Sequence, residues 1–342
     1  MFGPEWIVLG VNNVCNLHCK MCDVGTQNLE SNFAQNLVGT HPLNMPKELI
    51  FRIMDETAQH FPSAKVSYAF TEPLVYPHLA ESLAYAEQKG LFTSMTTNAL
   101  NLKRKADALL DGRINEIFVS LDGPQEIHNE IRGHKKSFQK AIEGIEALKK
   151  SPHCPRISII CAITEWNTGE LKQLIEDLKH LEIDEFAFMH TQFISSSAAD
   201  LHNQSRWGTN YPCYNSNVDI IDFSRMNLKE LQAEIASIRS TEYPFNVFFS
   251  PEIDELEDLK TYYLSPEKIL GKQCGAVYSS VMIKSDGQAI PAHGRCYNLD
   301  IGNIYEKNLK TIWKSPILKK LRGNLDKAGG LFPGCSRCCS GI

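Results

Sequence analysis

Three cysteines near the N-terminus have a spacing that can hold an iron–sulfur cluster. Cys15, Cys19 and Cys22 form a C-x3-C-x2-C run. Cysteine thiolates are the usual ligands of such clusters, and a cubic cluster has one iron for each of four ligands. Three thiolates therefore leave one iron open to a group that a substrate or cofactor brings. A zinc knuckle is the alternative, but zinc takes four ligands and would need His18 within the same short turn.

A second group of cysteines lies at the C-terminal end, around an expected β-hairpin of Val277–Ile283 and Gln288–Pro291 with Asp-Gly at its turn. Its expected metal ligands are Cys274, Cys296, Cys335 and Cys338. Cys339 is an alternative to Cys338. Four thiolates suit either a closed four-iron cluster or a tetrahedral zinc site, and spacing alone does not separate the two. A helix, roughly Leu309–Leu321, is expected between the hairpin and the last cysteines.

Short apolar strands alternate with amphipathic helices before this segment. The expected strands are Trp6–Leu9, Lys65–Ala69, Phe92–Thr96, Glu116–Leu121, Ile157–Ile163 and Glu185–Met189. The expected helices are Lys47–His60, Pro77–Lys89, Leu102–Leu110, Ser137–Lys149 and Thr168–Leu181. This alternation predicts a parallel α/β sheet, and no Gly-x-Gly-x-x-Gly follows the first strand to indicate a dinucleotide fold.

The curled form of such a sheet is favoured because polar residues follow the strand ends, where a barrel has its active site. Those after the second to sixth strands include Thr71, Glu72, Thr97, Asn98, Ser120, Asp122, Thr164, Asn167 and His190. We predict an α/β fold with a partial (β/α)6 barrel over 1–252 and a small cluster-binding domain over 253–342.

The N-terminal cysteine spacing resembles that of the radical S-adenosylmethionine (SAM) superfamily. In that family the amino and carboxylate groups of SAM chelate the open iron, and reductive cleavage gives a 5′-deoxyadenosyl radical that abstracts hydrogen from the substrate. The resemblance implies SAM, a 4Fe–4S cluster on Cys15, Cys19 and Cys22, and an electron donor of the flavodoxin or ferredoxin type.

The resemblance also assigns roles at the strand ends. In the family the second strand ends in Gly-Gly-Glu-Pro, and its Glu binds the amino group of SAM. Glu72 matches, whereas Phe70 and Thr71 replace the glycines that let a chain approach a ligand closely. Ser120 and Arg132, from a Ser-Leu-Asp-Gly … Arg-Gly stretch, are expected to bind the carboxylate of SAM. The expected cofactor-binding residues are Met21, Glu72, Asn98, Ser120, Asp122 and Arg132.

The C-terminal cysteines resemble the twitch domain, a shortened form of the SPASM domain, of radical SAM dehydrogenases and epimerases. That resemblance implies a second, auxiliary 4Fe–4S cluster on the four C-terminal ligands. A full SPASM domain would need more cysteines than this segment has.

Composition limits the other classes of function. The chain has 342 residues, eleven cysteines and a net charge of −5, which gives no electrostatic footprint for nucleic acid. We find no signal peptide and no apolar run of ~18 residues that would span a membrane. Reduced thiols in the cytoplasm are therefore expected to act as metal ligands.

The segment 191–222 is expected to form a substrate loop, because long irregular segments usually carry function. His190 and His293 are candidate catalytic bases by position, and the sequence does not choose between them; Cys213 is a candidate hydrogen-atom donor. Gln192, Trp207 and Tyr214 are expected in the substrate wall.

Three classes of function remain open. The first is dehydrogenation of a small polar substrate such as a sugar, cyclitol or aminoglycoside-like alcohol, with an epimerase that uses a cysteine donor as its variant. The second is a maturase of a ribosomal peptide, although a first strand at Trp6 leaves no room for a leader-binding domain. The third and weakest is a non-catalytic electron-transfer protein.

Overall fold

The computed structural model describes residues 3–218 and 220–338. Its strands form one sheet in the order β10-β9-β8-β1-β2-β3-β4-β5-β6-β7. The strands are β1 (Trp6–Leu9), β2 (Lys65–Tyr68), β3 (Thr93–Thr97), β4 (Glu116–Ser120), β5 (Arg156–Ile163), β6 (Glu185–His190), β7 (Asn246–Ser250), β8 (Ser280–Ile283), β9 (Gln288–Pro291) and β10 (Gly302–Asn303). All pairs from β1 to β7 are parallel. The predicted α/β partial barrel is confirmed.

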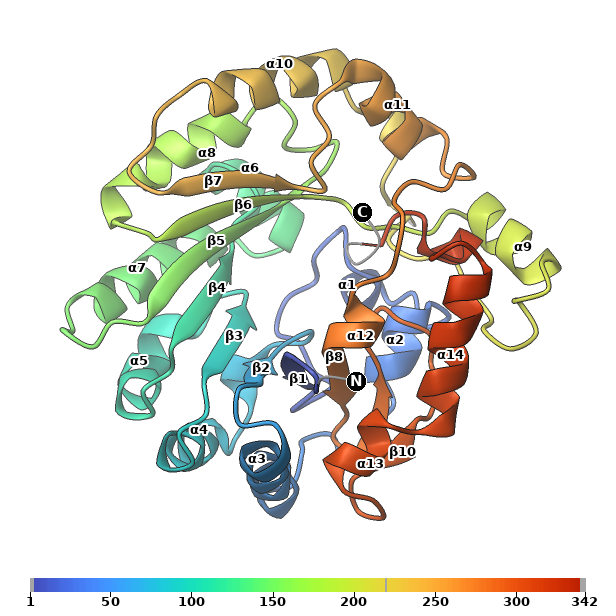
Figure 1. The fold of residues 1–342 in the computed structure, drawn as a ribbon. Helices are drawn as coiled ribbons and strands as arrows, with labels where there is room; N and C mark the ends of the chain where they lie inside the picture. Colours follow the sequence, from blue (N-terminus) through green and yellow to red (C-terminus); the bar gives the residue numbers. More distant parts are fainter. Residues whose placement is uncertain (1–2, 219, 339–342) are drawn as a thin grey trace.

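Helices cover the convex side of this curved sheet (Figure 1). They are α3 (Lys47–His60), α4 (Leu79–Gln88), α5 (Leu102–Asp111), α7 (Ser137–Lys149), α8 (Leu171–Leu178) and α10 (Leu228–Arg239). In α8 the buried positions are Leu171, Leu174, Ile175 and Leu178. This spacing places one apolar stripe against the sheet, as helical periodicity requires.

The concave side holds the segment that follows β1. It contains the short helices α1 (Asp23–Thr26) and α2 (Asn32–Leu37). Helix α6 (Gln125–Arg132) follows β4, and α9 (Ser196–Gln204) lies within the predicted substrate loop. Helix α11 (Leu256–Leu264) follows β7.

The sheet extends beyond the six predicted strands at both ends. Strand β7 pairs with β6 in parallel and becomes a seventh barrel strand. At the other end β8 pairs with β1 in parallel, from Trp6 beside Ser280 to Leu9 beside Ile283. The predicted hairpin is therefore part of the barrel sheet. The domain boundary at 252/253 stays a prediction.

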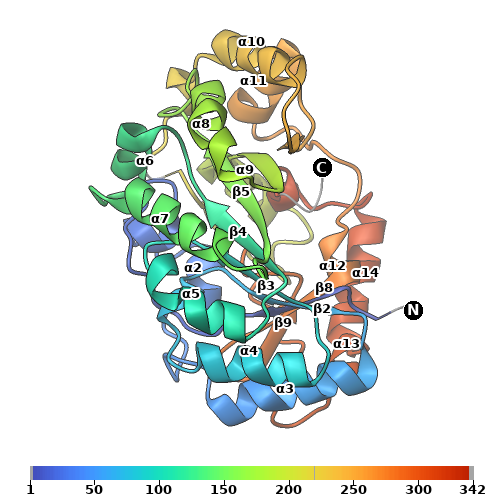
Figure 2. The same cartoon turned by 90° about the vertical axis from the view of Figure 1, so that its left-hand side faces the viewer.

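Two C-terminal elements differ from the prediction. Helix α12 (Ala276–Ser279) occupies the first part of the expected strand, and β8 begins only at Ser280. The expected single helix is divided into α13 (Leu309–Trp313) and α14 (Pro316–Lys327). Ser315 caps α14 through the Leu318 amide, and Pro316 has no amide with which to continue α13. Figures 1 and 2 both place α12, α13 and α14 beside the hairpin.

Among the described residues, no helix combines the length and the apolar character needed to cross a bilayer.

Candidate cofactor and cluster site

The cysteine loop after β1 is fastened to the end of β2. The Asn12 side-chain amide donates to the Glu72 carbonyl at 3.0 Å, and the Thr71 hydroxyl donates to the Asn12 carbonyl at 2.9 Å. The Glu72 amide donates in turn to the Val14 carbonyl at 3.3 Å. These bonds place Cys15 next to the residue predicted to bind the amino group of SAM.

The three N-terminal thiols form one group. Burial raises the pKa of Cys19 to about 12; Arg132 opposes this rise, and the charges of Cys22 and Cys15 add to it. Burial also raises the pKa of Cys15, to which the charge of Cys22 again contributes. Ligands of an iron cluster must lose their protons, so the binding of cationic iron would relieve the crowding of three thiolates. These residues fit a cube with one open iron.

Glu72 lies at the centre of a set of hydrogen-bond donors. Its carboxylate accepts from the Thr97 hydroxyl at 2.7 Å, the Asn98 amide at 2.8 Å and the Leu74 amide at 3.0 Å. The side chain is buried, and burial raises its pKa while these donors oppose the rise. A carboxylate has about four acceptor positions, so one remains for a cationic group.

Phe70 adopts a backbone conformation that glycine favours. Its φ is 86°, in the left-handed region. Replacement of the family's glycine therefore does not prevent the positive-φ turn before Glu72. The Phe70 ring packs against Phe33 at 6.0 Å and His293 at 5.9 Å between ring centroids. It thus connects the cofactor motif to the segment before Cys296.

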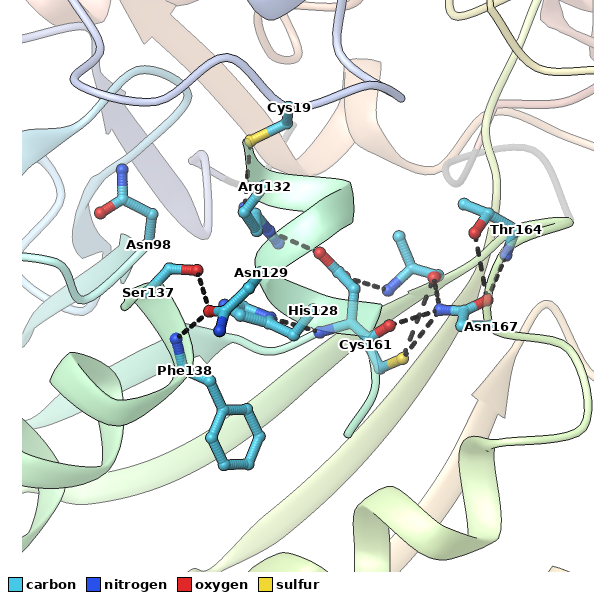
Figure 3. A network of polar contacts seen from close by, with 12 residues as sticks. Cys19, Asn98, His128, Asn129, Arg132, Ser137, Phe138, Cys161, Thr164 and Asn167 are labelled. Carbon is cyan, nitrogen blue, oxygen red and sulfur yellow. Dashed lines mark hydrogen bonds and ion pairs between the residues drawn. The ribbon is translucent and has the colours of Figure 1, made fainter. Parts of the chain in front are cut away.

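Arg132 is oriented by a buried carboxylate (Figure 3). Its Nε donates to Asp122 Oδ2 at 2.5 Å, and an Nη donates to Cys19 Sγ at 3.7 Å. The second oxygen of Asp122 accepts from the Ala162 amide at 2.9 Å. The Asp122 amide donates to Nδ1 of His128, whose pKa burial holds well below its ordinary value. The geometry gives Asp122 a positioning role, and its direct contact with a cofactor stays a prediction.

The remaining predicted cofactor residues lie around the same loop. The Asn98 side-chain amide donates to Asn16 Oδ1 at 2.8 Å and approaches Cys15 Sγ at 3.8 Å. Ser120 ends β4 and is only partly buried. Met21 is half-buried and belongs to neither described hydrophobic core cluster. Direct contacts of these three with SAM stay predictions.

The four predicted C-terminal ligands line one cavity: Cys274, Cys296, Cys335 and Cys338. Burial raises the pKa of Cys274 to about 11 and that of Cys335 to about 12, and in both the charge of Cys338 adds to the rise. A cube takes one thiolate per iron, so its ligands surround a volume and do not converge on a point. Among the described residues, no three His, Cys, Asp or Glu side chains are placed to hold a single ion. Cys339 lies outside the described residues.

The cavity itself has an empty volume of about 700 Å³, which includes space open to solvent. The substrate loop contributes Gln192, Phe193, Ile194 and Ser216, and α2 contributes Asn32 and Phe33. Of the predicted substrate wall, Gln192 lines this cavity, whereas Trp207 and Tyr214 are not among its described lining residues.

The two predicted catalytic residues are buried side chains. His190 is buried among aromatic rings, and its Nδ1 is 2.7 Å from the Tyr263 hydroxyl. Burial lowers its pKa to about 3, so it is neutral. Cys213 is also buried; burial raises its pKa to about 12, and the charge of Cys335 adds to the rise. The structure thus brings Cys213 to the auxiliary cysteines, and neither residue is among the described lining of the cavity.

A buried tether, which the sequence analysis missed, joins the cysteine loop to the substrate loop. Asp23 directly follows Cys22 and is fully buried. Its carboxylate accepts from the Ser216 hydroxyl at 2.5 Å and from the Asn217 amide at 2.7 Å. The Asn217 side chain donates to the Gln192 carbonyl at 2.8 Å. An acidic residue beside a cluster ligand was the only local signal of this contact.

Family models match both parts of the chain. The model described as the radical SAM superfamily matches residues 10–178, and the model described as an iron–sulfur cluster-binding domain, SPASM, matches residues 274–339. Both agree with the two cysteine groups.

Similar proteins of known structure share the fold. Streptococcus suis SuiB bound to S-adenosylmethionine is 18% identical with a TM-score of 0.62, over 94% of this chain and 68% of that chain. The anSMEcpe structure with bound AdoMet is 17% identical with a TM-score of 0.61, over 93% of this chain and 82% of that chain. The curated Fe-coproporphyrin III synthase of Methanosarcina barkeri is 26% identical over 185 residues, which are 54% of this chain and only 43% of that relative.

Proposed function

We propose that this chain, which belongs to the radical SAM superfamily and carries a C-terminal iron–sulfur cluster-binding domain, abstracts hydrogen from a peptide substrate. The observation that carries the proposal is that the substrate loop bridges both cysteine groups. The Ser216 hydroxyl donates to the carboxylate of Asp23, which follows Cys22, and Ser216 also lines the cavity that holds the C-terminal cysteines. A substrate bound along this loop would lie between the two groups.

The chain's own side chains would hold and orient the cofactors. Cys15, Cys19 and Cys22 would ligate the first cluster, and the four C-terminal cysteines would ligate the auxiliary one. When bound, SAM and a reduced cluster supply the 5′-deoxyadenosyl radical. Glu72 offers its remaining acceptor position to an ammonium group, and Arg132 offers the donors that Asp122 leaves unused to a carboxylate.

A peptide suits the cavity better than the sugar-like alcohol expected from the sequence. The walls include the apolar side chains of Phe33, Phe193, Ile194, Ala292 and Leu331. The same walls carry polar side chains such as Asn32, Gln192 and Ser216, so they suit a peptide with apolar side chains and backbone amides, whereas a polyol has little apolar surface to bury there. Structures of SuiB with its precursor peptide SuiA, and of anSMEcpe with a Cp18Cys peptide, add support for a peptide.

Within this proposal the reaction is an oxidation: the substrate would lose a hydrogen atom, a proton and one electron, and a cluster held by the four C-terminal cysteines would supply the electron acceptor. Inversion by a cysteine donor has less support, because Cys213 packs against Gly334 beside the auxiliary cysteines. A reducing compartment such as the cytoplasm, and a flavodoxin or ferredoxin as electron donor, complete the proposal.

The test is substrate-stimulated cleavage of SAM by the anaerobically reconstituted protein. Release of 5′-deoxyadenosine would be measured with dithionite, in the presence of a pool of short random peptides or of a pool of sugars and cyclitols. We expect stimulation by the peptides alone, and none after all three N-terminal cysteines are changed to Ala. Stimulation by the sugar pool alone would return the assignment to a small alcohol.

A further inference from the structure

The carboxylate of Asp23 is a buried charge without a cation beside it. Asp23 directly follows the cluster ligand Cys22 and is fully buried. Within residues 3–218 and 220–338, no Lys, Arg or His side chain lies within ion-pair distance of its oxygens. By contrast, the buried carboxylate of Asp122 is paired with Arg132. The negative charge of Asp23 is therefore not neutralised by a neighbouring side chain.

Neutral donors hold this carboxylate in place. Besides the Ser216 hydroxyl and the Asn217 amide, the Asn28 side-chain amide donates to it at 3.3 Å. Three donors without a charge stabilise the ionised form of a carboxyl group, but they do not cancel its charge. The Asp23 amide donates in return to Oδ1 of Asn217 at 3.3 Å. The charge is thus fixed at a place that is closed to solvent.

Helix α1, which begins at Asp23, lies directly on the cysteine loop. A Cβ atom at Gly25 would stand 2.4 Å from the Cys19 carbonyl oxygen and 2.6 Å from the Cys19 amide nitrogen, so this close approach requires glycine. The Thr26 amide donates to the Cys22 carbonyl at 2.8 Å. These contacts hold α1 against two of the cluster ligands, and the Asp23 charge therefore keeps a fixed place beside them.

We propose that the fixed charge of Asp23 lowers the reduction potential of the N-terminal cluster, which makes the reduced cluster a stronger electron donor to SAM. Reduction adds one electron to the cluster, and a negative charge nearby makes that addition less favourable. Neither water nor a cation screens this charge, so its effect is larger than that of a surface carboxylate. The proposal requires the cluster but no particular substrate, and so it goes beyond the proposed function.

The test is an anaerobic redox titration of the reconstituted holoenzyme with dithionite, followed by electron paramagnetic resonance. The signal of the N-terminal cluster is identified by its absence from the protein in which all three N-terminal cysteines are changed to Ala. Asp23→Asn removes the charge, whereas its amide oxygen can still accept from Asn217 and its NH2 group can donate to the Ser216 hydroxyl.

The expected result of Asp23→Asn is a higher reduction potential of the N-terminal cluster. A unit charge roughly 10 Å away in a partly buried site changes an equilibrium by about tenfold. For a one-electron couple this corresponds to a rise of about 59 mV. Asn28→Lys should raise the potential in the same direction. Asn28 is only partly buried, so the new ammonium group can neutralise the carboxylate while the bonds to the substrate loop stay in place.

Two control variants separate the charge from the hydrogen bonds and from stability. Ser216→Ala removes a donor of the substrate loop but keeps the Asp23 charge, so it should not raise the potential. Glu234→Gln should leave the potential unchanged. Glu234 is also buried and accepts from backbone amides, but it lies on α10, which covers the convex side of the sheet (Figure 1).

Three results would overturn the proposal. The first is an unchanged potential in iron-loaded Asp23→Asn, or in Asn28→Lys if Asp23→Asn does not load iron. The second is an equal rise in Ser216→Ala, which would assign the effect to the lost loop contact. The third is an equal rise in Glu234→Gln, which would assign it to lost stability. Failure of peptides to stimulate SAM cleavage would leave these potentials as they are and would count only against the proposed function.

Discussion

Glu72→Gln tests whether this buried carboxylate holds the amino group of SAM. The amide oxygen of Gln can keep the two donors that Glu72 Oε1 now receives, from Thr97 and Leu74. Its NH2 group would then face the Asn98 amide, which now donates to Oε2 at 2.8 Å. The change removes the charge that an ammonium group would meet, and hydrogen bonds to charged groups contribute about 1.5–3 kcal/mol. We therefore expect SAM to bind roughly ten- to a hundredfold more weakly.

The assay is anaerobic calorimetric titration of the reconstituted protein with SAM, together with iron analysis and thermal unfolding of each variant. Glu234→Gln is the matched control. Glu234 is also buried, and it accepts from the backbone amides of Gly169 at 2.9 Å and Lys172 at 3.1 Å. Both variants lose the same kind of bond, so both should lose stability, but only Glu72→Gln should lose affinity for SAM.

Two results would refute this reasoning. One is a Glu72→Gln protein with normal iron content that binds SAM as tightly as the unmodified chain does. The other is an equal loss of affinity in Glu234→Gln, which would trace the effect to lost stability.

Four further predictions follow from the same geometry. The reconstituted protein should hold about eight irons, and about four after replacement of all three N-terminal cysteines by Ala. Zinc at the C-terminal site, with no more than four irons in the unmodified protein, would rule out the auxiliary cluster. Asp122→Asn should weaken SAM binding by several-fold at unchanged iron content, since it frees Arg132 to turn; unchanged affinity in the same titration would contradict the positioning role. Phe70→Gly should unfold at a higher temperature than Phe70→Ala, because only glycine adopts a φ of 86° without strain of about 1 kcal/mol; the reverse order would contradict this. Burial lowers the pKa of His190 from 6.5 to about 3, so the unfolded chain gains a proton before the folded chain does as pH falls. Between about pH 6 and 4, the free energy of unfolding should therefore fall by about 1.4 kcal/mol per pH unit relative to that of His190→Gln. Urea unfolding measures both proteins, and parallel pH curves would refute the prediction.

The candidate site residues that the sequence could indicate are those carried by short local patterns. The N-terminal cysteine spacing and the Glu72 motif each lie within a few residues, so the chain near them reveals what they can bind. The barrel strands were equally visible, because β-branched and apolar runs such as those of β5 and β6 differ from the amphipathic helices between them. The end of β3 places Asn98 beside the cysteine loop, and helix α6, which follows β4, places Arg132 there.

Contacts between distant segments could not be predicted in the same way. Asp23 contacts Ser216 across 193 positions of the chain, and no sequence pattern around either residue predicts this contact. The pairing of β8 with β1 joins opposite ends of the chain, and a hairpin with its own apolar face gives no sign that it continues another sheet. His190 is the last residue of β6, near the strand end where active-site residues lie, yet its ring points into an aromatic core, because sequence position does not fix a rotamer.

The β1–β8 pairing has a consequence for how the two cysteine groups can work together. Hydrogen bonds of a parallel ladder, and not a flexible linker, fix the hairpin against the strand that leads to the N-terminal cysteines. The Asn36 bonds to Gly294 and Cys296, and the Phe70 contact with His293, add cross-links on the concave side. Because these contacts hold both groups to one rigid body, neither group can move toward a substrate independently. The tether at Asp23 fastens the substrate loop to the same body, so this loop also has a fixed place relative to the two cysteine groups.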